Sequence, residues 1–323
     1  MATDFQPRTL QEAILWFADP MNCHNAVVAI RWPDGVVKCP RCGSEQVKYL
    51  NAARVWKCYG NHERAKFSLK VGTIFEDSPL PLQKWLPALW LLVNCKNGIS
   101  SYELARALDV TQKTAWFMLS RLRLALQAKD GGKLGGEVEV DETYIGGKAR
   151  NMHASKRKRM GITQGNSMAG KVAVMGLLDR HGKDGVSQIR LQVVKGRKRG
   201  HFRPVIDKHV PTGATINTDS HLSYQGLADS YTHNVIDHAE AYVDGQIHTN
   251  GCENFWSLLK RAIKGTYVSV EPFHLFRYLD EQAFRFNERR ANDASRFALS
   301  LKGIINKRLT YVALTGKELP QTC

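Results

Sequence analysis

Long hydrophobic runs are scarce in this sequence of 323 residues. The longest, Trp85 to Val93, is about half of the roughly 20 residues that a membrane helix needs, so we expect no membrane partner. The first residues also lack the basic stretch followed by an apolar core that marks a secretory signal. The seven cysteines are an odd number and include a Cys-x-x-Cys pair, which argues against a disulfide framework. These absences predict a cytoplasmic, nucleoid-associated protein.

Acidic residues are also fewer than basic residues in this sequence. The sequence has 30 Asp plus Glu against 46 Lys plus Arg, a formal net charge of +16, and a surplus this large indicates a polyanionic partner. The charge is clustered in two tracts, Lys148 to Met160 and Lys195 to Phe202, which favours a nucleic acid over a merely soluble basic protein. We predict that both tracts are loops that contact the DNA backbone. Their candidate contact residues are Lys156, Arg157, Lys158, Arg159, Arg197, Lys198 and Arg199.

The chain shows no internal repeat and divides into three segments of different texture. Residues 1–75 carry an N-terminal helix pattern and three closely spaced cysteines. Residues 76–130 have helical periodicity, and residues 135–323 mix strand and helix patterns. Four glycines in nine residues, from Ala128 to Gly136, predict a linker between the last two segments.

The closely spaced cysteines resemble a zinc ribbon with one irregular corner. Cys39 and Cys42 form a Cys-x-x-Cys knuckle followed by glycine, which points both sulfurs at one metal. Cys58 lies where the second half-site is expected, but the partner position is Asn61, which cannot supply a thiolate. His62 is the nearest substitute, and thiolate and imidazole are both good zinc ligands. We therefore predict a structural Zn²⁺ bound by three cysteines and this histidine.

Two alternatives to that zinc site stay open at this stage. Cys23 or His24 could supply the fourth ligand instead, and a degenerate ribbon could fold on its apolar core alone. In either zinc version the role is structural, because four protein ligands leave no open position for chemistry.

A helix-turn-helix pattern follows in the second segment. Ser100 with Glu103 has the form of a capping box, and Thr111 can cap a second helix after a short turn. Gln112 and Lys113 would then open the second helix, where a recognition helix meets base edges. A plain helical hairpin gives the same pattern, but the basic chain and the neighbouring ribbon favour DNA binding.

Four carboxylates crowd one predicted strand in the third segment: Glu137, Glu139, Asp141 and Glu142. Like charges repel, and buried ones cost several kcal/mol unless something positive compensates them. Strand alternation places Asp141 on the side of Glu139, opposite the valines, which favours it over Glu142 without deciding between them.

Two further acids follow at a distance. Asp219 ends a short β-branched strand, and Glu253 lies on a helix whose face with Trp256, Ser257 and Lys260 is predicted to point away from the core. Each acid alone reads as a solvated turn or cap. Three together can hold two divalent cations, Mg²⁺ with Mn²⁺ as a substitute, and the metal charge would compensate the acidic strand.

Several motifs occur together in an order that is specific although each is weak alone. They are "CPRCG", "FSLKVGTIFEDSPLPLQKW", "VEVDETYIGGK", "TDSHLSYQGL", "HTNGCENFWSLLKRAIKGTY" and "FRFNERR", and they span about residues 15 to 295. In these motifs the chain resembles bacterial insertion-sequence DDE transposases of the ISXO-like type. The resemblance implies an α/β fold in which an RNase H-like catalytic domain follows a zinc ribbon and a helix-turn-helix segment.

The same resemblance implies roles for individual residues. Asp141, Asp219 and Glu253 would be the catalytic, magnesium-binding acids, although some members of the group carry Asn at the third position. Lys260 and Arg261 match the basic pair that follows on the same helix. The ribbon departs from the family because its usual fourth cysteine is absent, which bears on zinc binding and not on catalysis.

The expected activity is that of an insertion-sequence transposase. Such an enzyme binds the terminal inverted repeats in double-stranded DNA, hydrolyses phosphodiesters at the element ends and joins the 3′-hydroxyls to target DNA, as a homodimer or larger assembly. Two rival functions are a domesticated DNA-binding regulator and an RNase H-like nuclease without strand transfer.

Overall fold

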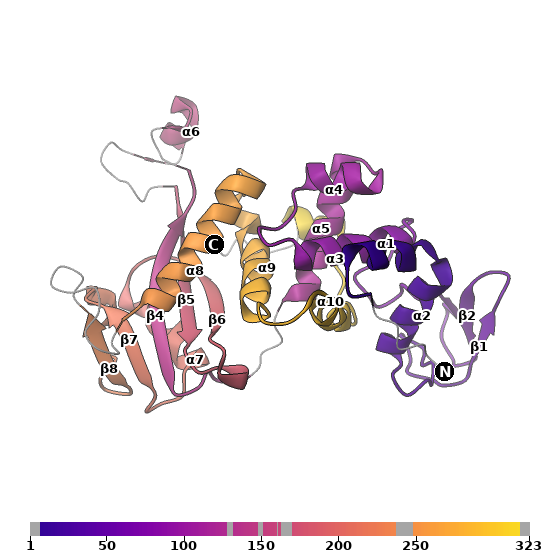
Figure 1. Cartoon of the computed structure of the whole chain (residues 1–323), viewed down its shortest axis with the longest axis horizontal. Helices are drawn as coiled ribbons and strands as arrows, with labels where there is room; N and C mark the ends of the chain where they lie inside the picture. The colour runs from indigo at the N-terminus through magenta and orange to yellow at the C-terminus, as the bar shows by residue number, and fades with distance from the viewer. Residues whose placement is uncertain are drawn as a thin grey trace. The chain divides into compact units, whose positions relative to one another are not determined.

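The chain folds into two compact units in this computed structural model. The structure describes residues 7–127, 132–147, 151–159, 161–162, 170–236 and 248–316. Unit 1 contains the described residues up to 127 together with 289–316, and unit 2 contains the described residues between them. The chain therefore leaves unit 1, forms unit 2 and returns to unit 1. The colour gradient of Figure 1, from indigo at the N-terminus to yellow at the C-terminus, traces this path.

Unit 1 begins with two helices and a small sheet. Thr9 caps the first helix by accepting a hydrogen bond from the Glu12 backbone N–H, and Asp19 caps the second. The three strands of the sheet pair antiparallel in the order β1-β2-β3. The bounds are α1 Leu10–Ala18, α2 Pro20–Arg31, β1 Val47–Leu50, β2 Val55–Cys58 and β3 Lys66–Phe67.

The rest of unit 1 is helical and includes the segment that returns from unit 2. Phe297 of the returning segment packs its ring 5.3 Å from that of Phe17 and 5.4 Å from that of Trp90, centroid to centroid. These apolar contacts explain why the C-terminal helices belong to this unit. The bounds are α3 Leu82–Asn94, α4 Ser101–Leu108, α5 Gln112–Leu126, α10 Asp293–Lys302 and α11 Tyr311–Thr315.

Unit 2 is built on a five-stranded mixed sheet in the order β6-β5-β4-β7-β8. β4, β5 and β6 form an antiparallel meander, whereas β7 and β8 run parallel to β4. The strands are β4 Glu137–Ile145, β5 Val172–Asp179, β6 Gln188–Val194, β7 Thr215–Asp219 and β8 Thr232–Ile236. The helices are α6 Ala154–Arg159, α7 Arg199–His209, α8 Asn250–Ala262 and α9 Leu275–Asn287.

The two faces of this sheet pack against different helices. On one face Val138 and Val140 of β4 join Phe202 and Ile206 of α7 in a core. On the other face α8 crosses β4 and β5 while α9 lies along β6, as Figure 1 shows. The alternation of β4 therefore sends its valines toward α7 and its alternate acids toward α8.

The three-segment division from the sequence stays a prediction, but its last boundary differs from these units. Residues 289–316 pack on unit 1, whereas the sequence placed them with the strands of the third segment. The difference arises because Phe297 and Leu301 bury their side chains in unit 1, a contact that no local pattern announces. None of the helices in the described ranges is long and apolar enough to cross a membrane.

Candidate active site and metal centre

Four potential zinc ligands meet at the knuckles of the small sheet in unit 1. The ligand atoms of Cys39, Cys42, Cys58 and His62 all lie within 4.8 Å of one another. Cys42 Sγ is 3.6 Å from Cys58 Sγ, and Cys39 Sγ is 3.5 Å from His62 Nε2. Gly60 leaves room for the sulfurs, because a Cβ at this position would come within 3.1 Å of the Cys42 sulfur and would crowd it.

The spacing of these atoms matches a tetrahedral zinc ion. With Zn–S near 2.3 Å and Zn–N near 2.0 Å, sulfurs should lie about 3.8 Å apart and sulfur and nitrogen about 3.5 Å apart. The alternative ligands point elsewhere: Cys23 donates its thiol hydrogen to the Phe17 carbonyl, and His24 stacks on the Trp56 ring. The cluster therefore supports a structural Zn²⁺ with His62 at the irregular corner.

The first two predicted acids of unit 2 project from neighbouring parallel strands. The pairing of β4 with β7 ends with Glu139 opposite Asn217, and the same register continued by two residues aligns Asp141 with Asp219. The two carboxylates are close enough for the charge of Asp219 to raise the pKa of Asp141. Neighbouring strands lie about 4.8 Å apart, and both side chains take the face that α8 covers. The structure thus brings two acids together that are far apart in the sequence.

Asp141 is held by a tryptophan of α8. Trp256 Nε1 donates a hydrogen bond to Asp141 Oδ2 at 2.8 Å, and the Glu142 backbone N–H donates to Oδ1 at the same distance. The indole lies over Gly176 of β5, where an added Cβ would come within 2.7 Å of the ring. Burial raises the pKa of Asp141 from 3.8 to about 6, against these hydrogen bonds and helped by the charges of Glu142 and Asp219.

Glu142 serves a different role on the opposite face of the sheet. Its carboxylate accepts a hydrogen bond from the Tyr224 hydroxyl at 2.7 Å and lies 3.6 Å from Arg197 Nε. Burial and this carboxylate raise the pKa of Tyr224 well above its usual value. Glu142 therefore has partners on this face, whereas Asp141 points to the face that α8 covers.

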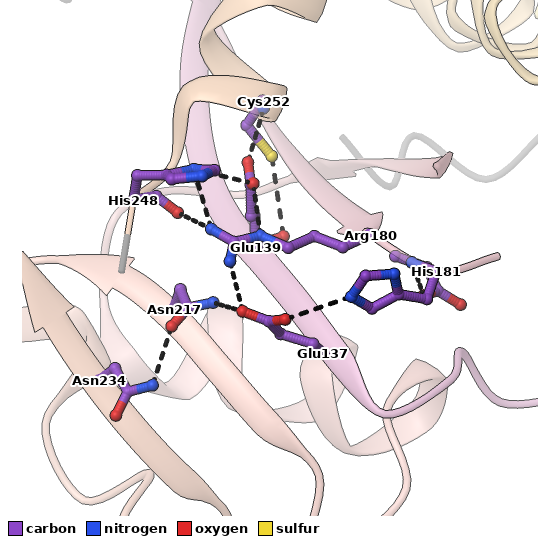
Figure 2. Close-up of polar contacts among 9 residues, drawn as sticks. Glu137, Glu139, Arg180, His181, Asn217, Asn234, His248 and Cys252 are labelled. Atoms are coloured by element: carbon purple, nitrogen blue, oxygen red, sulfur yellow. Dashed lines mark hydrogen bonds and ion pairs between the residues drawn. The ribbon is translucent and has the colours of Figure 1, made fainter. Parts of the chain in front are cut away.

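An arginine compensates the two remaining acids of β4, which corrects the expectation that metal charge alone would do so. Figure 2 shows Arg180 between Glu137 and Glu139, with Nε 2.8 Å from Glu139 Oε1 and Nη1 paired with Glu137. Asn217 adds a 3.0 Å hydrogen bond to Glu137 Oε1. Arg180 also donates to the His248 carbonyl at 2.7 Å. Asp141 is thus the β4 carboxylate without a basic partner among the described ion pairs.

The same network fixes the first turn of α8. The Cys252 backbone N–H donates to Glu139 Oε2 at 3.0 Å, so a carboxylate that is 1% exposed meets the positive end of the helix. Gly251 allows this approach, since a Cβ there would come within 2.8 Å of Glu139 Oε2. Glu253, the third predicted acid, follows on this anchored turn and is exposed.

The three acids do not close around a point in this structure. Among the described residues, the group of three or more ligands within mutual reach is the Cys/His cluster and not Asp141, Asp219 and Glu253. Trp256, predicted on the face away from the core, is buried at 4% exposure, because the sheet leaves a seat for it at Gly176. Glu253 lies three residues before it, in the first turn of α8.

The helices α4 and α5 follow the predicted start signals. Ser100 and Glu103 form the reciprocal capping box, and Thr111 Oγ1 accepts from the Thr114 backbone N–H, so both caps are confirmed. Lys113 is exposed at the start of α5, whereas the Gln112 amide donates to Ser101 Oγ at 2.9 Å.

The prediction that both basic tracts are loops is wrong, because each contains helical residues. In the first tract Ala154–Arg159 forms α6, Lys148 and Met160 lie outside the described residues, and so does the side chain of Lys156. In the second, α7 begins at Arg199 because Phe202 is drawn into the core at 0% exposure. The remaining candidates are exposed or half-buried in the structure: Arg157, Lys158, Arg159, Arg197, Lys198, Arg199, Lys260 and Arg261.

Sequence reasoning missed the residues that hold the acids in place. A lone glycine inside a strand pattern signals a close approach, and Gly176 in "VAVMGLLD" was such a signal. Arg180 and His248 gave none, because their partners on β4 become neighbours only through the pairing of β4 with β5 and the placement of α8.

Both the ribbon and the sheet of unit 2 lie in regions that match known protein families. Residues 133–287 match the ISXO2-like transposase domain, and residues 20–60 match the transposase zinc-ribbon domain. An uncharacterized protein in transposable element ISH50 of Halobacterium salinarum is 30% identical over 253 residues, which cover 76% of this chain and 83% of that protein. Because the ribbon and the acid-bearing unit match in the order in which the chain carries them, this chain belongs to the ISXO2-like transposase family.

Proposed function

We propose that this transposase binds the terminal inverted repeats of its own element, cuts phosphodiesters at the element ends and joins the freed 3′-hydroxyls to target DNA. The observation that carries the proposal is the alignment of Asp141 with Asp219 on neighbouring parallel strands under α8. The strand order β6-β5-β4-β7-β8 supports an RNase H-like catalytic unit. The α4–α5 pair with exposed Lys113 supports a helix-turn-helix that reads DNA.

The residues at the acid site suit magnesium. Hard oxygen ligands are what Mg²⁺ prefers, and Asp141 is a half-buried carboxylate with no cation partner in the described ion pairs. Asp141, Asp219 and Glu253 would hold the ions. Bound divalent ions would supply activation of water or a 3′-hydroxyl and stabilisation of the leaving oxygen.

The chain's own residues orient the reaction. Trp256 fixes one oxygen of Asp141 and the Glu142 N–H fixes the other, so the carboxylate keeps one rotamer while lone pairs stay available on both. Arg180 and Glu139 hold the turn that carries Glu253. Lys260 and Arg261, exposed further along α8, would contact DNA phosphates. No serine or tyrosine nucleophile is needed, and two element ends require at least a dimer.

The test uses the DNA that flanks the gene. Both flanks are placed on a plasmid, purified protein and Mg²⁺ are added, and 3′ ends and joined products are mapped at nucleotide resolution. We expect cuts at the inverted-repeat tips and joined products, both lost in Asp219→Asn while DNA binding persists. Binding without cleavage by the unaltered protein would sink the proposal and leave a regulator, and cleavage without joining would leave a nuclease.

A further inference from the structure

The small sheet of unit 1 has one face with a row of aromatic side chains. Tyr49 of β1 is opposite Trp56 of β2, and Trp56 is opposite Phe67 of β3. The Trp56 ring stacks on Phe67 and on His24 of α2. This face is therefore packed against the rest of unit 1, and the strand alternation leaves the other face outward.

The outward face carries a row of lysines in the same register. Lys48 of β1 is opposite Lys57 of β2, and Lys57 is opposite Lys66 of β3. Lys48 and Lys66 are exposed and Lys57 is half-buried. With strands about 4.8 Å apart, the three lysine side chains start from one line about 10 Å long across the sheet.

No carboxylate neutralises this row within the described residues. Ion pairs of the ribbon region go elsewhere, since Asp34 and Glu45 pair with Lys38. Lys57 Nζ instead lies 5.0 Å from the ring centre of Tyr59, which is 55% exposed. Arg41 adds a further cation at the edge, donating to the Lys66 carbonyl at 3.0 Å. Like charges directly opposite each other on paired strands repel, so a bound polyanion would reduce the repulsion among these lysines.

We propose that the lysine row Lys48, Lys57 and Lys66 is a contact surface for the phosphate backbone of double-stranded DNA. A line of flexible ammonium groups matches a line of phosphates, and such contacts position a protein without reading sequence. The inference rests on the proposed function. It gives the zinc ribbon its own phosphate contact with DNA, separate from the Cys/His cluster and from the α4–α5 pair. Tyr59 beside the row offers a ring to the sugar edge of the same strand.

The test measures binding of the full-length, zinc-loaded protein to a labelled element-end duplex and to a scrambled duplex, from low to high salt. One variant replaces the row by Lys48→Gln, Lys57→Gln and Lys66→Gln. A control variant removes the same charge from exposed lysines outside the row: Lys38→Gln, Lys96→Gln and Lys302→Gln.

Each phosphate contact contributes about 0.9 to the slope of log affinity against log salt, so the row variant should lose about 2.7. Affinity at physiological salt should fall roughly ten- to a hundredfold on both duplexes alike, because the contacts do not read bases. The Lys→Arg version of the row should restore the slope. A row variant whose slope and affinity equal those of the control overturns the proposal, and zinc content per chain shows that the ribbon remains folded.

The two proposals fail separately. Salt-dependent binding that is lost in the row variant, without cleavage by the unaltered protein, keeps this surface and removes the transposition chemistry. Cleavage and joining with an unchanged slope in the row variant keeps the chemistry and removes this surface.

Discussion

The two candidate metal sites of this chain differ in how complete they are. In unit 1 the four ligands of the Cys/His cluster lie within 4.8 Å of one another, and they come as two pairs from two tight turns, one with Gly43 and one with Gly60. In unit 2 Asp141 and Asp219 are aligned on fixed strands, while Glu253 is exposed on α8 and does not complete the group. The chain alone therefore closes the Cys/His cluster, as a structural zinc site requires, whereas it does not close the three acids into one group.

Loss of one zinc ligand should have the largest effect, because it breaks the closed site. His62→Ala should lower bound zinc well below one ion per chain and unfold the ribbon, since binding free energy of a structural zinc is folding free energy. Metal analysis and protease sensitivity of the N-terminal segment measure this. His24→Ala is the control, because His24 packs on Trp56 outside the cluster; equal zinc in both variants would contradict the Cys3His assignment.

Loss of Arg180 should break the frame of the open site. Arg180→Ala leaves Glu139, whose side chain is 1% exposed, without its arginine. The Cys252 N–H and His248 Nδ1, 3.3 Å from Glu139 Oε1, remain, so we expect the lower end of the range for a broken buried pair, about 3 kcal/mol in unfolding free energy. Urea unfolding measures the change. Arg308→Ala removes a pair with Asp77 in which both side chains are more than half exposed, and it should cost far less; similar losses in the two variants would refute the central role of Arg180.

Asp141→Asn should stabilise unit 2 and so show that the open site is held at a cost. The pKa of Asp141 is raised from 3.8 to about 6, so its carboxylate destabilises the fold fully above pH 6 and not at all below about pH 4. In the absence of added Mg²⁺ the variant should be about 3 kcal/mol more stable at pH 7, with the gain vanishing as the pH falls to 4. A gain that does not depend on pH would contradict this origin.

Trp256→Phe should give the smallest effect and sharpen the account of Asp141. The N–H that fixes Asp141 Oδ2 is lost, so cleavage should fall roughly ten- to a hundredfold. The smaller ring lacks the Cζ2 and Cη2 atoms that lie over Gly176, so stability should also fall, by about 1 kcal/mol. Leu258→Phe is the control: it changes a half-buried side chain of the same helix that makes no hydrogen bond to Asp141, so it should leave cleavage unchanged. Unchanged cleavage in Trp256→Phe would show that the indole only fills space.

The sequence predicted what depends on neighbours along the chain. The caps at Ser100 and Thr111 are local hydrogen bonds, and the face shared by Glu139 and Asp141 follows from strand alternation alone. Partners of a buried charge depend on tertiary placement instead. Arg180 reaches β4 through an antiparallel pairing, and Trp256 reaches Asp141 from 115 positions away, so neither contact has a local signature.

Two predictions, the loop at the start of α7 and the exposed position of Trp256 on α8, were wrong for the same physical reason. The second basic tract was expected to be a loop because its charges dominate the pattern, yet the single Phe202 gains more from burial in the sheet core than the tract gains from remaining extended. Helical periodicity groups Trp256 with the polar residues of one face of α8 and so predicts that it is exposed. The structure buries it, because periodicity averages over a face and does not register the burial of one large side chain.

The return of the chain to unit 1 has a consequence for the order of synthesis. α10 carries Phe297, which packs on Phe17 and Trp90, but it leaves the ribosome only after the whole of residues 128–288. At about 5–20 residues per second, the first helices wait on the order of ten to thirty seconds with this apolar surface uncovered. A transposase cut short after its catalytic unit would therefore lack part of the core of its N-terminal unit.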